Sequence, residues 1–209
     1  MRVGLYVPPF CEGERAGGPP PGVVALAKKA RIDLLVLPES YLVREDLEAV
    51  RSDAERLAEH LHNETGAAVA VGASVLEKGR SCEEDRDETR YLLVYVSGKH
   101  YWYQKHAMTH RSAVDHGDWK RDWGKYQLVV ERGGVRMGFS LCYDMYLPLV
   151  AHHLRSRAVH LYVNPSQVNV VYAKWAAMLQ GRAVEIAVSY THLRAHETEA
   201  DLVCRLLLE

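Results

Sequence analysis

The feature that most constrains the fold is an uninterrupted apolar run in the segment "IDLLVLPES", residues 32–40. A strand with one face in water alternates apolar and polar residues, whereas a continuous run is typical of a strand buried on both faces. A sheet buried in this way is covered by helices. We therefore expect an α/β fold in which Pro38 ends this buried strand.

Segments around this run alternate between strand and helix patterns. Ser52 and Glu55 have the spacing of a capping box, and Gly66 closes the segment that follows, so we expect an amphipathic helix there. The order strand, helix, strand, helix, strand is the signature of an α/β unit. Its expected elements cover residues 2–7, 23–31, 32–40, 52–65 and 67–75.

The second half of the chain predicts two hairpins, followed by helices and a further strand. The first hairpin turns at "SGK", and the second at Gly133-Gly134, a pair that tolerates the positive φ such turns need. The expected elements are hairpins over residues 91–105 and 126–142, a helix after Cys142 with Leu147, Val150, Ala151 and Leu154 on one face, a strand over 159–166 and a helix over 172–186.

Two polar stretches lie between these elements. Residues 77–90 are highly charged, and we expect a solvated loop without chemistry of its own. Residues 106–125 are polar and aromatic without periodicity, which favours a loop at a functional site.

The composition argues against several classes of partner. Lys plus Arg (26) nearly balance Asp plus Glu (27), so no strong field attracts nucleic acid or an anionic membrane. The four cysteines are scattered without a C-x-x-C pair, which argues against a disulfide framework or a zinc–cysteine site. The segment "MRVGLYVPPF" reaches prolines too early for a signal peptide, and no apolar run approaches the roughly 18 residues of a membrane span. We expect one soluble, cytoplasmic globular domain.

Three residues share one position in the predicted elements. Glu39, Lys105 and Cys142 each lie at the carboxyl end of a predicted strand. In open α/β sheets ligands bind at that edge, and catalytic side chains collect there. Each residue taken alone also fits an inert role, as a solvated glutamate, a lysine extending from a hairpin end, or a buried thiol.

The segments around these residues resemble three signature segments of the nitrilase, or carbon–nitrogen hydrolase, superfamily. They read "LLVLPES", "YWYQKHAM" and "GFSLCYDMYLP", and they supply glutamate, lysine and cysteine in the family's chain order. A fourth stretch, from "NPSQ" through "WAAMLQGRAVEIAV", resembles the family's next strand and helix. The resemblance spans residues 2 to about 187 and implies an α-β-β-α sandwich, a homo-oligomer, and no metal or organic cofactor.

The resemblance also implies an amidohydrolase that acts on a small linear amide or carbamoyl compound. Cys142 would be the nucleophile and Glu39 its base, because a free thiol with a pKa of about 8.5 is mostly protonated at neutral pH. The Lys105 ammonium and the Tyr143 N–H would stabilise the oxyanion that forms when the thiolate attacks a carbonyl.

Further candidate site residues match the pattern of the superfamily less closely. Many members carry a second glutamate between the lysine and the cysteine, whereas "DHGDWKRDWG" has none. Asp118 is the candidate by its offset from Cys142, and Asp115 is next. Asn164 and Ser166 lie where the family lines its substrate pocket, although "NPS" is also common turn chemistry.

The end of the chain departs from the family pattern. Residues 189–209, "SYTHLRAHETEADLVCRLLLE", have no counterpart in the family, which would continue into further sheet. They resemble translated sequencing-adapter read-through. We therefore expect a carbon–nitrogen hydrolase domain over residues 1–188, a non-family tail of artefactual origin over 189–209, and a sandwich that is incomplete at its C-terminus.

Three other interpretations stay open. A Cys-His hydrolase would use His106 or His110 as its base. A metal site could draw on His110, Asp115, His116 and Asp118, although their spacing matches no strong metal motif. The chain could also be an inactive fragment with a binding or structural role, because a missing strand would leave an unpaired sheet edge.

Overall fold

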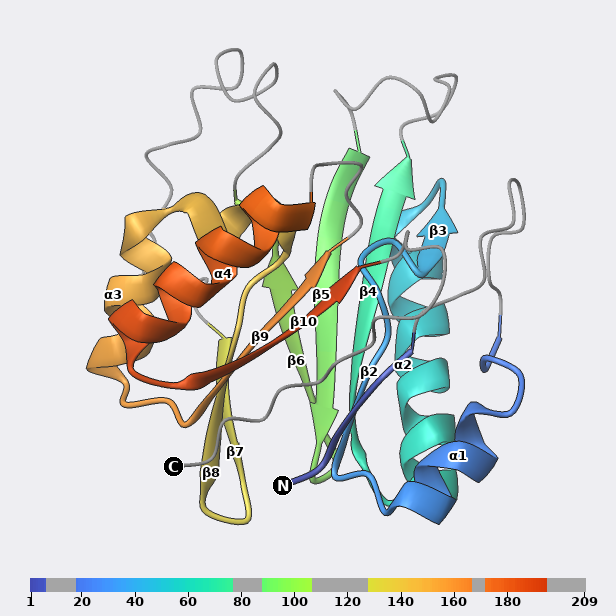
Figure 1. Cartoon of the computed structure of the whole chain (residues 1–209). Helices are drawn as coiled ribbons and strands as arrows, with labels where there is room; N and C mark the ends of the chain where they lie inside the picture. The colour runs from blue at the N-terminus through green and yellow to red at the C-terminus, as the bar shows by residue number, and fades with distance from the viewer. Residues whose placement is uncertain (7–17, 77–87, 107–127, 167–171, 195–209) are drawn as a thin grey trace.

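Two facing sheets with a pair of helices on each outer side make up the computed structural model (Figure 1). The structure describes residues 1–6, 18–76, 88–106, 128–166 and 172–194. None of the helices in these ranges is long and apolar enough to span a membrane. Helices α1 (Val23–Ala30) and α2 (Leu47–Thr65) cover one sheet, and α3 (Pro148–Ser156) and α4 (Tyr172–Ile186) cover the other. The predicted α-β-β-α sandwich is confirmed.

The first sheet contains the elements predicted for the first half of the chain and the first hairpin. Its order is β1-β2-β4-β5-β6, and β3 also pairs with β4. The pairs β1–β2, β2–β4 and β3–β4 are parallel, whereas β4–β5 and β5–β6 are antiparallel. The strands are β1 (Val3–Leu5), β2 (Leu34–Val36), β3 (Leu42–Arg44), β4 (Ala68–Leu76), β5 (Glu88–Val96) and β6 (Lys99–Gln104).

The second sheet has the order β10-β9-β8-β7. Its hairpin turns at Gly133 and Gly134, whose φ angles of 56° and 77° confirm the predicted turn. Strand β10 pairs in parallel with β9, so the sheet continues past residue 188, where we expected the family domain to end. That boundary stays a prediction. The strands are β7 (Leu128–Arg132), β8 (Val135–Phe139), β9 (Leu161–Ser166) and β10 (Ser189–Arg194).

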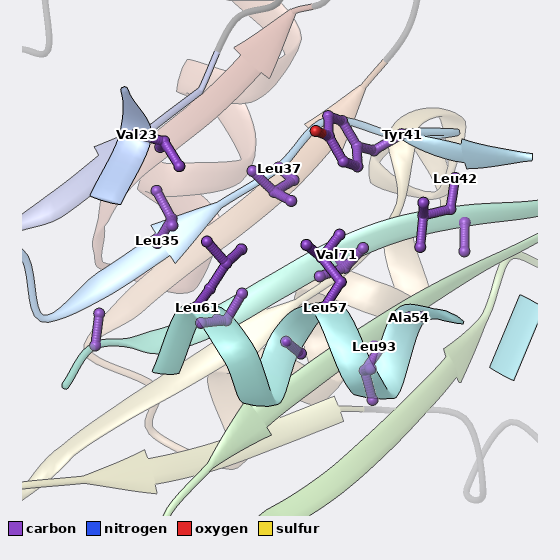
Figure 2. Packing of buried hydrophobic residues seen from close by; sticks show 14 of the residues in the cluster. Val23, Leu35, Leu37, Tyr41, Leu42, Ala54, Leu57, Leu61, Val71 and Leu93 are labelled. Carbon is purple, nitrogen blue, oxygen red and sulfur yellow. The ribbon is translucent and has the colours of Figure 1, made fainter. Parts of the chain in front are cut away.

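The continuous apolar run that predicts the fold is buried on both faces. Leu34 and Val36 belong to the core between the two sheets, whereas Leu35 and Leu37 belong to the core beneath the helices. Figure 2 shows Leu57 of α2 in that second core, near the labelled strand residues. Because each fully buried leucine stabilises the fold by about 1.5–3 kcal/mol, this alternation anchors β2 in the middle of the sandwich.

Helix α2 begins earlier than its sequence pattern predicts. Its N-cap is Asp46, whose side chain accepts a 2.8 Å hydrogen bond from the Ala49 amide. The predicted start at Ser52 is therefore wrong, because Asp46, six residues earlier, supplies the N-cap and satisfies an otherwise free amide. The predicted end is confirmed, since Gly66 follows the helix with φ 73°.

The helix expected after Cys142 is confirmed as α3, which buries Val150, Ala151 and Leu154. A short 3-10 helix, η3, covers Cys142–Tyr146, and α3 begins only at Pro148. Proline has no N–H to donate back into a preceding helical turn, but it fits the first position of a new helix. The chain after the cysteine therefore turns tightly before α3 starts.

Gly72 of β4 allows the chain after β2 to approach closely. A Cβ at this position would lie 2.1 Å from the Pro38 carbonyl oxygen and 2.6 Å from the Glu39 Cα. We expect Gly72→Ala to lower the free energy of unfolding in urea by about 3 kcal/mol, because both obstructing groups are backbone. Gly181→Ala in α4 is the control, since nothing lies within 4 Å and it should stabilise the fold by about 0.5–1 kcal/mol. Equal stability of the two variants would contradict this packing.

Candidate active site

Glu39 lies in a tight turn that follows β2. The Tyr41 amide donates to the Pro38 carbonyl at 3.3 Å, and Ser40 adopts φ 56°. The Ser40 hydroxyl also hydrogen-bonds the Ser74 hydroxyl on β4 at 2.6 Å. The turn therefore rests on β4, and it buries Glu39 to 1 % exposure.

The neighbouring strands bring two cations to the same place. Ser74 of β4 pairs with Arg90 of β5, and the Lys105 amide donates to the Arg90 carbonyl at 2.9 Å. Residues directly opposite one another on adjacent strands extend to the same face of a sheet. Arg90 and Lys105 therefore reach Glu39 from adjacent strands.

Glu39 forms a buried ion pair with both cations. Its Oε1 accepts hydrogen bonds from Lys105 Nζ at 2.9 Å and from Arg90 Nη1 at 3.1 Å. Burial alone would raise the pKa of Glu39, but the charges of Lys105 and Arg90 outweigh it and hold that pKa below 4.5. Burial likewise opposes the charge on Lys105, but Glu39 raises the lysine pKa above its usual value. Both groups are charged at neutral pH.

Arg90 corrects one expectation from the sequence. We expected residues 77–90 to be a solvated loop without chemistry, but β5 begins at Glu88, and the Arg90 side chain is only 13 % exposed and contacts Glu39. The position of Arg90 was predictable from the first hairpin. Its register pairs Tyr91 with Gln104, and one further step places Arg90 opposite Lys105. The other residues of the stretch through 87 lie outside the described part of the chain.

Cys142 is held in an uncommon backbone conformation between β8 and α3. Its φ is 49°, and it is 1 % exposed. Non-glycine residues in this left-handed region are strained and persist only where surrounding contacts enforce the conformation. One such contact is the 3.2 Å hydrogen bond from Asn164 Nδ2 to the Cys142 carbonyl.

The pKa of the Cys142 thiol depends on the neighbouring Glu39. Burial raises the pKa of the thiol, and the negative charge of Glu39 raises it further, while Lys105 and Arg90 act in the opposite direction. The thiol and the carboxylate are close enough that each shifts the pKa of the other. The resting sulfur therefore keeps its proton, and an adjacent ionised carboxylate is in position to accept it.

Asn164 and Ser166 belong to a buried polar network behind the cysteine. Asn164 Nδ2 donates to Ser140 Oγ at 2.6 Å, and Ser166 Oγ donates to Asn164 Oδ1 at 2.8 Å. Ser140 Oγ also hydrogen-bonds the Tyr162 hydroxyl at 2.6 Å. The contacts of this network hold the turn that begins at Cys142, whereas the expected role of both residues in lining a substrate pocket stays a prediction.

The remaining candidates are placed only in part. The Tyr143 ring stacks on Tyr146 with centroids 4.5 Å apart, and its backbone N–H as an oxyanion donor stays a prediction. The His106 amide donates to Asp144 at 3.0 Å, and its ring lies 5.2 Å from that of Tyr103. Four candidates lie outside the described residues, namely His110, Asp115, His116 and Asp118.

The sequence profile of carbon-nitrogen hydrolases matches residues 22–190. The chain belongs to the carbon-nitrogen hydrolase family. It is 28% identical over 155 residues to "Omega-amidase YafV" of Escherichia coli K12, an alignment that covers 73% of this chain and 58% of that protein. The chain thus spans little more than half the length of this curated relative.

Solved structures of nitrilase-superfamily proteins share the fold. An amidase from Nesterenkonia sp. superposes with a TM-score of 0.66 at 18% identity, covering 93% of this chain and 75% of the amidase. A CN-hydrolase superfamily protein from Xanthomonas campestris, with an arsenic adduct in its active site, gives 0.55 at 21% identity, covering 81% and 67%. These likenesses confirm the predicted fold.

The buried ion pair predicts a pH-dependent loss of stability in Glu39→Gln. The variant leaves Lys105 and Arg90 without their carboxylate, so the free energy of unfolding should fall by about 3 kcal/mol at neutral pH. Because the pKa of Glu39 is lowered from 4.5, its ionised form stabilises the fold above that pH, and the contribution is lost as pH falls through the folded-state pKa. The difference in the free energy of unfolding between wild type and Glu39→Gln should therefore shrink below pH 4.5.

A matched control separates this effect from the loss of an ordinary ion pair. Glu64 pairs with Lys28 at 3.0 Å, and both side chains are about half exposed, so Glu64→Gln should leave the urea midpoint nearly unchanged. If Glu39→Gln were as mild as Glu64→Gln at neutral pH, the buried pair would not have the energetic role assigned here.

Proposed function

We propose that the protein is an amidohydrolase that cleaves the C–N bond of a small linear amide or carbamoyl compound through a thioester on Cys142. The observation that carries the proposal is Glu39, whose carboxylate contacts the Lys105 ammonium at 2.9 Å and lies close enough to the buried Cys142 thiol for the two groups to shift each other's pKa. A base, a cation and a nucleophile thereby meet at one buried point. Acyl transfer needs these three functions.

In the first half-reaction the amide acylates the enzyme. Cys142 Sγ bonds to the carbonyl carbon while the thiol proton passes to Glu39, which avoids forming a free buried thiolate. The carbonyl π electrons move to oxygen, where the Lys105 ammonium and the Tyr143 N–H stabilise the negative charge. When the carbonyl re-forms, the C–N bond breaks, and the nitrogen takes the proton from Glu39 and leaves as ammonia or an amine.

In the second half-reaction water releases the acid. Glu39, again ionised, accepts a proton from water as the oxygen bonds to the thioester carbon. The C–S bond then breaks, the proton returns from Glu39 to sulfur, and a carboxylic acid leaves. The same carboxylate serves both halves, and transfer to an acceptor other than water would use the same thioester.

The substrate class rests on the family and on named relatives. The curated relative is named an omega-amidase, and a mutant of the Nesterenkonia amidase was solved in complex with butyramide. Another mutant of that amidase shows Michael addition of acrylamide at its active-site cysteine. A short-chain amide is therefore the first substrate to test. Asp118 as the second carboxylate, a homo-oligomeric state and a cytoplasmic location remain predictions that accompany this proposal.

Covalent capture tests the nucleophile. Wild-type protein incubated with fluoroacetamide should gain one adduct, which peptide mass spectrometry should locate at Cys142. Cys142→Ser should lose this adduct and all release of ammonia from butyramide, because a neutral buried hydroxyl is a far weaker nucleophile than a thiol. An adduct that persists on Cys11 or Cys82 in this variant would contradict the assignment.

A second pair of variants tests the base. Glu39→Gln should reduce kcat for butyramide by about 100-fold or more, because positioned proton transfer contributes roughly 10²–10⁴-fold to such reactions. His106→Gln should retain kcat within about 3-fold, since the hydrogen bond that His106 donates to Asp144 comes from its backbone amide, which the substitution keeps. Loss of turnover in the histidine variant alone would instead favour a Cys-His hydrolase.

A further inference from the structure

The catalytic candidates lie on two different sheets. Cys142 follows β8 of the second sheet, whereas Glu39 and Lys105 follow β2 and β6 of the first. Most of the interface between the sheets is apolar packing, which is non-directional and so does not by itself specify the position of one atom. A hydrogen bond between the two sheets, close to these residues, would specify such a position.

Asp144 supplies such a contact from the turn that begins at Cys142 to the lysine strand. It lies two residues after Cys142 within η3 and is fully buried. Its Oδ2 accepts a 2.6 Å hydrogen bond from the Tyr103 hydroxyl, and its Oδ1 accepts a 3.0 Å hydrogen bond from the His106 amide. These two donors flank Lys105 on both sides in the chain.

The geometry needs a carboxylate rather than any polar group. The Tyr103 hydroxyl and the His106 amide are both donors, and an ionised aspartate offers only acceptors, whereas an asparagine would present its NH₂ group to one of these two donors. Burial and the neighbouring Asp144 charge raise the pKa of Tyr103, so its hydroxyl stays protonated and remains a donor. An isosteric Asp144→Asn variant therefore breaks one of these two contacts and sets an N–H against a donor, without leaving a cavity.

We propose that Asp144 is a positioning residue that sets the separation between Cys142 and Lys105 across the two sheets. The proposal rests on the function proposed above, because that separation decides whether the lysine reaches the oxyanion formed at the sulfur. It gives a role to the aspartate of "CYD" that is distinct from proton transfer, since its oxygens are bonded to Tyr103 and His106.

Crystal structures of wild type, Asp144→Asn and Tyr103→Phe test the positioning directly. We expect the distance from Lys105 Nζ to Cys142 Sγ to change by about 0.5–1 Å in Asp144→Asn, beyond the tolerance of a catalytic constellation. The Lys105–Glu39 contact of 2.9 Å should persist, because it lies within the first sheet. Tyr103→Phe removes one of the two donors and should show a smaller shift in the same direction. Unchanged distances in both variants would overturn the proposal.

Kinetics with butyramide give a second readout that a purely structural role would not produce. We expect Asp144→Asn to lower kcat by about 10- to 100-fold with KM within about 3-fold, since a misplacement of about 1 Å can cost that much in rate. Asp53→Asn is the control, because Asp53 pairs with Arg44 and Arg56 at helix α2, and its kcat should match wild type. A shifted lysine with unchanged kcat would also overturn the proposal.

The two proposals fail in distinguishable ways. If wild-type protein released no ammonia from butyramide or other short amides, the proposed function would fail. The crystallographic distances would still decide the role of Asp144. If wild type were active and the distances did not move, the function would stand and the positioning role would be rejected.

Discussion

The buried contact between Glu39 and Lys105 is the interaction on which the rest of the site depends. Two charges removed from water are costly unless their geometry is close and further hydrogen bonds satisfy them. Here the lysine contacts the carboxylate at 2.9 Å and Arg90 adds a second contact on the same oxygen at 3.1 Å. The close approach of the Glu39 turn to Gly72 and the register of the β5–β6 hairpin both serve this contact.

The division of the site between two sheets explains why the polar networks around it are buried. Apolar packing brings the sheets together, but directional bonds are needed to orient the strained Cys142 toward Glu39 on the opposite sheet. Asn164 binds the Cys142 carbonyl from β9, and Asp144 binds the chain on both sides of Lys105. The turn that begins at Cys142 is thereby held from both sheets.

Much of this arrangement follows from the sequence, and the rest depends on long-range contacts. The alternation at Leu34 to Leu37 and the Gly133-Gly134 turn were predictable, because each is a local rule about burial or φ. The family resemblance supplied the order of Glu39, Lys105 and Cys142. The arginine at the site was missed because charge density alone suggested a solvated loop, whereas strand register decides which charge is buried. A competing N-cap likewise moved the start of α2.

In the proposed mechanism one bound amide touches Glu39, Lys105 and Cys142 at once, and a crystal structure of Cys142→Ala soaked with butyramide tests this most directly. We expect the carbonyl oxygen within about 3 Å of Lys105 Nζ, the amide nitrogen within reach of Glu39, and the carbonyl carbon facing the position of the missing sulfur. An amide bound elsewhere, or one whose carbonyl faces away from the lysine, would contradict it.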